Sequence, residues 1–230
     1  MNIGILTACT KHNPFTRNGK CDFLEPGSMN HLKYCLEHDY SYVVEHVDNI
    51  VVKGMHPTWV KIFALKKYLN NFDYCVWIDS DCVFVRNEIK IEDFVKNSDI
   101  DLFVPKGDVS NGYFTTAVTT GFMILKNCQW SKDLLNTLLN YSEYFKPENG
   151  YHEQSALSQI LRQNLYFENC ENLKSGLVED LETFYFERNL CVMPYRYHQV
   201  NPDAPMSYLF HAGGSSKNKK QNLINFLNGQ

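Results

Sequence analysis

The sequence predicts an α/β domain with a mostly parallel sheet, because segments with strand and helix patterns alternate along the chain. Between Ile3 and Asp79 the order is strand, helix, strand, helix, strand, which is typical of parallel sheets covered by helices. The last of these strands, FDYCVWID at residues 72–79, is apolar over most of its length, as strands buried on both faces are. The 230 residues contain no clear linker and no repeat, so we expect one domain over residues 1–230.

The individual elements follow from local patterns. The helix at residues 56–71 is the clearest, because apolar residues from Trp59 to Leu69 recur at helical spacing after Pro57, which suits a first helical turn. Residues 10–28 are rich in Gly, Pro, Asn and Lys and favour a loop. Strands are expected at residues 3–9, 40–47, 72–79, 101–106, 119–127 and 207–214. The other expected helices cover residues 29–38, 91–97, 130–145 and 151–164.

Composition excludes several classes of protein. The net charge of −4 and the pI of about 6.1 argue against a general nucleic-acid binder, which would usually be basic. The N-terminus lacks the basic start and long apolar run of a secretory signal, and no window reaches the roughly 18 apolar residues of a membrane span. We therefore expect an intracellular, soluble protein. None of the eight cysteines forms a CxxC pair, so reduced thiols are expected, with Cys75 as a core residue.

The first candidate for chemistry is Asp79-Ser80-Asp81, which directly follows the apolar strand. Burying a carboxylate is costly unless it is paired or coordinates a metal. In open α/β sheets, ligands bind outside the carboxyl ends of the strands, and two aspartates there can hold Mg²⁺ or Mn²⁺ through oxygen. The alternative is a turn in which the aspartates cap backbone N–H groups.

The second candidate is FHAGGSSKNKK, residues 210–220. His211 can complete a metal site, Gly214 permits close backbone approach to a phosphate, and Lys217 supplies a positive charge for a phosphate oxygen. Taken alone, such a string is more often a surface turn.

Together these motifs resemble the GT-A-fold, nucleotide-sugar-dependent glycosyltransferases. The sequence most resembles the retaining galactosyl-, xylosyl- and mannosyltransferases of glycosyltransferase family 34. Four segments carry the resemblance: HPTWVKIFALKKYL followed by YCVWIDSD, then TTGFMILKNCQWS, HEQSAL and FHAGG. The resemblance implies a GT-A fold with the DxD motif at a strand end. It also implies a nucleotide-sugar half at about residues 1–110 and an acceptor-side half at about 111–230.

On the donor side, the resemblance implies a metal site of Asp79, Asp81 and His211 that holds Mn²⁺ or Mg²⁺. Asp79 would lie near the donor ribose and the metal, and Ser80 would also belong to the nucleotide-sugar site. Gly214 and Lys217 would contact the diphosphate, and Thr7, Ala8 and Cys9 would line the nucleotide base. Lys61 would face the donor, the alternative being a solvated helix residue, while Trp59 and Trp130 belong to the core.

On the acceptor side, Glu153 and Gln154 match the pair that lies near the reacting sugar carbon in the family. The sequence departs from the family here, since an aspartate is usual at Glu153 and an asparagine is common at Thr120. Glu153 and Gln154 could also be first-turn residues that favour the helix dipole. Retention is implied by resemblance only; in an inverting enzyme Glu153 would be the leading base.

The leading hypothesis is therefore a metal-dependent glycosyltransferase that uses a UDP-sugar, or less favourably GDP-mannose, and a saccharide acceptor. A non-catalytic nucleotide-sugar or glycan-binding module on the same fold is the first alternative. A DxD phosphatase ranks lower, because its motif should end the first strand. A bacterial or viral cytoplasmic enzyme fits the start at Met1, and a Golgi enzyme trimmed of its anchor is the alternative. The sequence does not indicate an oligomeric state.

Overall fold

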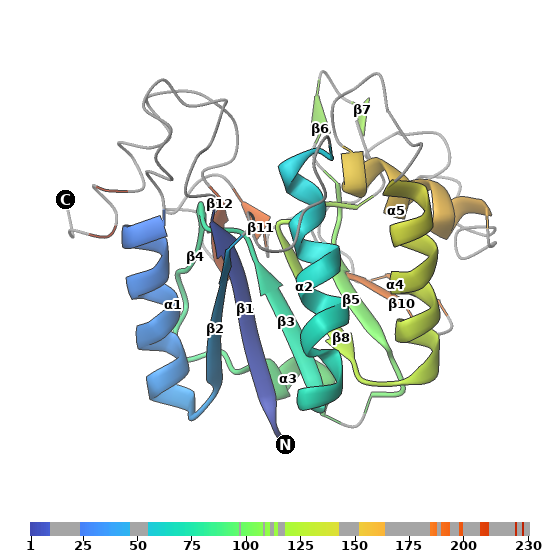
Figure 1. Cartoon of the computed structure of the whole chain (residues 1–230). Coiled ribbons are helices and arrows are strands. Elements are labelled where there is room, and N and C mark those ends of the chain that lie inside the picture. Colours follow the sequence, from blue (N-terminus) through green and yellow to red (C-terminus); the bar gives the residue numbers. More distant parts are fainter. Residues whose placement is uncertain are drawn as a thin grey trace.

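The structure is a computed structural model of the chain (Figure 1). It describes residues 1–9, 24–46, 55–96, 98–107, 109–110, 113–114, 118–142, 152–163, 185–187, 190–193, 198–199, 208–211, 224 and 227. The statements below refer to this part of the chain.

A seven-stranded sheet with the order β2-β1-β3-β8-β5-β10-β9 forms the centre of the molecule (Figure 1). Its strands are β1 (Ile3–Cys9), β2 (Ser41–His46), β3 (Tyr74–Ile78), β5 (Leu102–Pro105), β8 (Phe122–Lys126), β9 (Tyr185–Glu187) and β10 (Leu190–Met193). The strands β1, β2 and β3 are parallel, and so are β5 and β10. Because β8 is antiparallel to both β3 and β5, all these strands except β8 and β9 share one direction. The α/β prediction is confirmed, with a mixed sheet in which one direction predominates.

The helices occur where the sequence predicts them, with one difference in extent. They are α1 (Leu24–His38), α2 (Val60–Tyr68) between the 3₁₀ turns η2 (Pro57–Trp59) and η3 (Leu69–Asn71), α3 (Ile91–Val95), α4 (Gln129–Ser142) and α5 (His152–Gln163). The expected loop at residues 10–28 is wrong for its last five residues, because α1 already begins at Leu24. Proline is tolerated in a first helical turn, so Pro26 does not prevent this early start.

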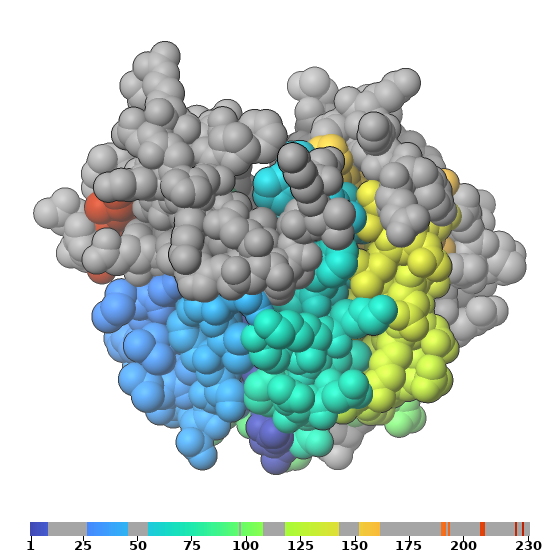
Figure 2. Space-filling model, in the orientation of Figure 1, coloured from blue at the N-terminus to red at the C-terminus, as the bar shows by residue number. Residues whose placement is uncertain are grey.

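Two apolar layers cover the sheet. The helices α2, α4 and α5 pack on one face, and α1 and α3 pack on the other. Strand alternation assigns β1 to both layers: Leu6 and Ala8 belong to the first, Ile3 and Ile5 to the second. Figure 2 shows α2 and α4 at the surface of the first layer. Trp59 is buried there as expected, and Trp130 is partly buried at the margin of the same cluster.

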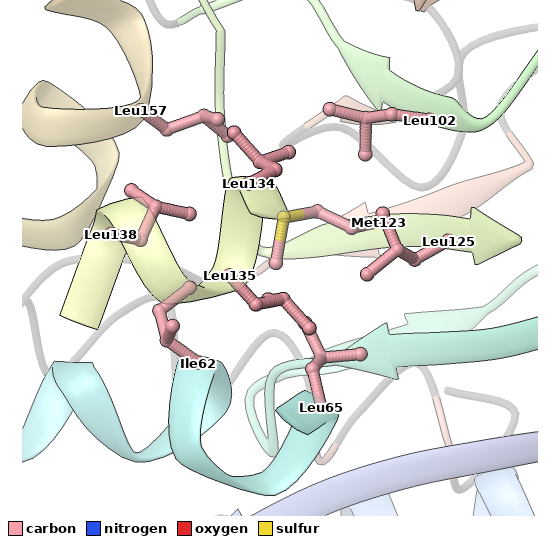
Figure 3. A pocket seen from close by; sticks show the side chains of 9 residues that line it. All are labelled: Ile62, Leu65, Leu102, Met123, Leu125, Leu134, Leu135, Leu138 and Leu157. Atoms are coloured by element: carbon pink, nitrogen blue, oxygen red, sulfur yellow. The ribbon is translucent and has the colours of Figure 1, made fainter. Parts of the chain in front are cut away.

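The first layer contains a small void between α2, α4, α5 and the sheet. Nine apolar side chains converge on it (Figure 3), and its volume is about 10 Å³. That is at most the room of one water molecule, and the lining supplies no polar partner for it. The void is a feature of the core and offers no space for a substrate.

A three-stranded sheet with the order β11-β12-β4 lies beside the main sheet (Figure 1). It consists of β4 (Cys82–Phe84), β11 (His198–Gln199) and β12 (Leu209–His211). The late strand β12 was expected, whereas β4 was not, because its three residues are too few to give a pattern. The short strands β6 (Val109–Ser110) and β7 (Tyr113–Phe114) pair with each other.

The described cysteines and helices agree with the expectation of reduced thiols and with the lack of a membrane-spanning pattern in the sequence. The cysteines whose side chains are described, Cys35, Cys75, Cys82, Cys128 and Cys191, are free thiols, and Cys75 is buried in the core. Among the described helices, none is long and apolar enough to cross a membrane.

Candidate functional site

The residues Asp79, Ser80 and Asp81 form the turn that joins β3 to β4. The backbone N–H of Asp79 extends the main sheet by donating to the Gly121 carbonyl at 2.9 Å, and the N–H of Cys82 donates to the Asp79 carbonyl at 2.9 Å. The turn therefore has a fixed backbone. It stands at the carboxyl end of β3, on the edge of the sheet where α/β proteins bind ligands.

Strand pairing brings the second sequence motif to this turn. In the antiparallel ladder of β4 and β12, His211 lies opposite Cys82, the residue after Asp81. Two segments about 130 positions apart in the chain thus meet at one point. The predicted ligands Asp81 and His211 come close in the fold by backbone register alone. Gly214 and Lys217 lie outside the described residues, so their predicted contacts with a diphosphate remain predictions.

Two side chains, Trp77 and Lys61, hold the carboxylate of Asp79. The indole Nε1 of Trp77 donates to its Oδ1 at 2.6 Å, and the Lys61 ammonium lies 3.0 Å from the same oxygen. Trp77 and Asp79 share one face because side chains two apart in an extended chain do so. The Asp79 side chain keeps 25% of its surface exposed, so it can still meet a ligand from solvent.

Lys61 of α2 lies at the centre of a buried polar cluster. Its side chain is only 5% exposed, and its ammonium lies 3.0 Å from Glu153 Oε1 as well as from Asp79. It also donates to the carbonyl and the hydroxyl of Thr120, each at 3.2 Å. The alternative of a solvated helix residue is therefore wrong. Lys61 is predicted to face the donor; in the structure it contacts Asp79, so it would act on a donor by holding that carboxylate.

Opposite charges set the protonation states in the cluster. Burial alone lowers the pKa of Lys61, but the charges of Asp79 and Glu153 outweigh it and hold the pKa above its usual value. Burial alone raises the pKa of Glu153, yet the charge of Lys61 and hydrogen bonds from Thr58 and Lys61 hold it below its usual value. Both groups are therefore ionised at neutral pH, and Glu153 is a weak base.

Thr120 fixes the other half of the cluster. Its backbone N–H donates to Gln154 Oε1 at 2.9 Å, and its hydroxyl lies 3.0 Å from Glu153 Oε1. Both side chains from the start of α5 are buried. Glu153 Oε1 thus lies 3.0 Å from both the Lys61 ammonium and the Thr120 hydroxyl. Sequence reasoning noted Thr120 only as a departure from the family pattern and missed its place between these residues.

Two histidines stand at the helix starts next to the cluster. The rings of His56, before η2, and His152, the first residue of α5, stack with centroids 3.8 Å apart. Burial and the neighbouring charge of His152 lower the pKa of His56. Parallel rings at this distance cannot direct two nitrogens at one ion, so the stack serves as a packing contact between the two helix starts.

The predicted base-binding edge lies at the carboxyl end of β1. Thr7 is fully buried, and its hydroxyl has no hydrogen-bond partner among the described residues, which is uncommon for a buried polar group. Ala8 is buried, and Cys9 pairs in register with His46 of β2. An unsatisfied hydroxyl at this edge is compatible with a polar ligand group that would complete it.

The described side chains alone do not complete a metal site. Among them there is no group of three or more His, Cys, Asp and Glu residues that could hold an ion. The side chain of His211 is outside the described set, while its backbone is placed opposite Cys82. Two carboxylates and one imidazole are a donor set that Mn²⁺ accepts. The residues therefore fit the cation in chemical type.

Comparison with known proteins adds the family and the fold. A family model described as "Protein of unknown function, DUF273" matches residues 32–183. Galactomannan galactosyltransferase 1 of Cyamopsis tetragonoloba is 24% identical over 129 residues, which cover 54% of this chain and 28% of that enzyme. The matched segment is thus less than a third of the plant enzyme's length.

Two solved structures match nearly the whole chain. A glycosyltransferase involved in glycosylation of the major capsid of PBCV-1 superposes with a TM-score of 0.62 at 14% identity, covering 97% of this chain and 99% of that one. An active-site mutant of LgtC superposes with a TM-score of 0.53 at 10% identity, covering 98% and 95%. The chain has the GT-A glycosyltransferase fold, and the distant similarity to family 34 is confirmed.

Proposed function

This chain belongs to the DUF273 family of proteins of unknown function, and we propose that it is a metal-dependent glycosyltransferase. It moves a hexose or pentose from a nucleoside diphosphate sugar to a hydroxyl of a glycan acceptor, with retention of configuration. The observation that supports this most directly is the register of β4 and β12, in which His211 lies opposite the residue after Asp81. In a chain with the GT-A fold, an aspartate turn and a histidine strand that meet in this way are candidates for the ligands of the donor-site cation.

The donor half of the proposal assigns roles along the carboxyl edge of the sheet. Asp81 and His211 hold the cation, with Asp79 beside them, and Gly214 and Lys217 contact the diphosphate. Thr7, Ala8 and Cys9 line the base, and Ser80 lies near the ribose. A bound Mn²⁺ or Mg²⁺ would stabilise the charge that develops on the departing diphosphate.

The reaction half rests on the buried cluster. When the bond between the sugar carbon and the diphosphate breaks, positive charge develops on the sugar, and the oxygens of Glu153 and Gln154 stabilise it. Glu153 has a low pKa and is paired with Lys61, which makes it a poor proton acceptor. The departing phosphate takes the acceptor's proton as the hydroxyl oxygen bonds to the sugar carbon. This assignment favours retention over an inverting reaction with Glu153 as base.

A UDP-sugar is the favoured donor, and GDP-mannose is the second choice. The distant plant relative is a galactosyltransferase, which makes UDP-galactose the first donor to test. The acceptor is a saccharide on a glycan, a glycolipid or a protein.

The experiment is a donor-turnover assay. The protein is incubated with Mn²⁺ and UDP-galactose, UDP-glucose, UDP-xylose or GDP-mannose, and release of the nucleoside diphosphate is measured with and without saccharide acceptors. Slow donor hydrolysis that requires Mn²⁺ and disappears in Asp81→Ala is the expected result. Nucleotide binding without any turnover would instead indicate a binding module. Release of phosphate from simple monoesters would indicate a phosphatase.

A further inference from the structure

Helix α1 lies directly against β4 (Figure 1) and also reaches the turn that bears the aspartates. In the part of the chain that the structure describes, β4 is the last strand of its sheet, so one of its edges has no neighbouring strand there. In an antiparallel strand the backbone groups of alternate residues point to opposite edges. Val85 donates to the Tyr208 carbonyl on the β12 side, which leaves the backbone groups of Cys82 and Phe84 on the open edge.

Two side chains of α1 occupy this open edge. The Asn30 amide donates to the Phe84 carbonyl at 3.0 Å and accepts from the Phe84 N–H at 2.8 Å, as a neighbouring strand would. His31 Nε2 lies 2.6 Å from the Cys82 carbonyl, and that oxygen can only accept. The proton of His31 is therefore on Nε2, and burial lowers its pKa to about 4, so the ring is neutral.

A third contact reaches the turn itself. The position of Gly27, one helical turn before His31, has no room for a side chain, because a Cβ there would overlap the Ser80 carbonyl oxygen. The backbone of α1 therefore touches the residue between Asp79 and Asp81. Gly27, Asn30 and His31 together contact the backbone at Ser80, Phe84 and Cys82, on both sides of Asp81.

We propose that Gly27, Asn30 and His31 are positioning residues of the donor site. They fix the backbone of the turn and of β4, and through it the place of Asp81 relative to His211 on β12. They make no contact with the ligand themselves. This inference rests on the proposed function, since it assigns to α1 control over affinity for a divalent cation with a nucleoside diphosphate.

Two variants test this inference, one by adding a side chain at the contact and the other by removing a hydrogen bond. Gly27→Ala favours the helix by propensity but can relieve its contact only by separating α1 from the turn. His31→Phe keeps a ring of similar size and removes the bond to Cys82. The matched control is His38→Phe, because His38 Nε2 makes the same kind of bond, 2.6 Å from the Asn87 carbonyl, farther along the same helix.

The readouts are the affinity for Mn²⁺ in the presence of UDP, and hydrogen exchange of residues 79–85 without any ligand. Gly27→Ala and His31→Phe should each weaken Mn²⁺ binding by about 10- to 100-fold, as loss of partners behind metal ligands does. Both should also speed exchange in the 79–85 segment, while His38→Phe changes neither readout. Melting curves without ligand identify the temperature at which all four proteins are folded.

The outcomes separate this inference from the proposed function. If the wild-type protein binds Mn²⁺ with UDP and both variants bind equally well, the role of α1 is wrong and the proposed function stands. If His38→Phe weakens binding as much as His31→Phe, the effect is a general loss of stability and the inference fails. If the wild-type protein binds no Mn²⁺ with UDP or GDP, both proposals fail.

Discussion

At the scale of single residues, Lys61 is the positive charge that two carboxylates share. It joins Asp79, which follows β3, to Glu153 at the start of α5, and so connects the donor side of the proposed site with the reaction side. Replacing Lys61 with an apolar residue would leave the Glu153 carboxylate buried without a cation. The cost in stability would then exceed the net contribution of the ion pair, because the remaining charge is uncompensated.

We expect Lys61→Met to lower the free energy of unfolding by about 3 to 5 kcal/mol, the cost of breaking a buried ion pair. In the wild-type protein the low pKa of Glu153 contributes stability that is lost only as pH falls through that pKa. The high pKa of Lys61 contributes stability that is lost only as pH rises through it. In the variant, burial without Lys61 raises the pKa of Glu153, so the contribution of Glu153 to stability is greatest at low pH and is lost as pH rises through the raised pKa. Thermal melting between about pH 5 and pH 8 measures both effects.

The control for this variant is Lys66→Met, at an exposed position of the same helix. It should melt like the wild-type protein at every pH. Adding Glu153→Gln to Lys61→Met should remove the extra pH dependence, because the buried group then no longer titrates. A Lys61→Met protein with wild-type stability and pH dependence would show that the ion pairs are not formed in solution.

Some site residues follow from the sequence and others do not. Asp79, Asp81 and His211 could be selected because their motifs have a chemical meaning at strand ends. The Trp77 contact could have been found from its two-residue spacing to Asp79, which places both on one face. Thr120, Asn30 and His31 could not, because their partners are backbone and side-chain groups far along the chain that become neighbours only in the fold.

At the scale of elements, α2, α4 and α5 form one apolar layer on the sheet. Leucines of these helices and Ile62 of α2 converge with Met123, Leu125 and Leu102 of the sheet on a void of about 10 Å³ (Figure 3). Tight packing of this layer keeps the start of α5, and with it Glu153 and Gln154, in place against α2.

We expect Leu135→Ala, in α4, to destabilise the protein by about 2 to 5 kcal/mol, because the side chain is 2% exposed and its removal enlarges the void. Leu36→Ala, in α1, is the matched control, since that leucine is 75% exposed and should change stability by less than about 0.5 kcal/mol. Urea unfolding of both variants measures the difference. Equal effects at the two positions would contradict the packing of α4 on the sheet.

Most elements could be predicted because they carry their own local pattern. The continuous apolar run of β3 and the helical spacing in α2 are of this kind. The strand β4 could not, since Cys82–Phe84 is short and is defined by its pairing with β12 and by the side chains of α1. The start of α1 was also missed, because Pro26 and Gly27 favour a loop in isolation.

At the scale of the whole molecule, the class of fold could be predicted and the strand order could not. The alternation of strands and helices indicates a sheet with helices on both faces. The insertion of β8 between β3 and β5, antiparallel to both, depends on contacts between distant segments. That insertion is what brings Thr120, just before β8, to Lys61 and the start of α5.

The central claim is that the turn after β3 and the strand β12 together form a cation site for a nucleotide donor. The most direct test is calorimetric titration of UDP into the wild-type protein, Asp81→Asn and His211→Ala, with and without Mn²⁺. The exposed Asp99→Asn serves as control. We predict that UDP binds the wild-type protein and Asp99→Asn only with Mn²⁺, and that the two ligand variants lose at least about tenfold in affinity. Binding of UDP that is equally tight without Mn²⁺, or unchanged in Asp81→Asn and His211→Ala, would contradict it.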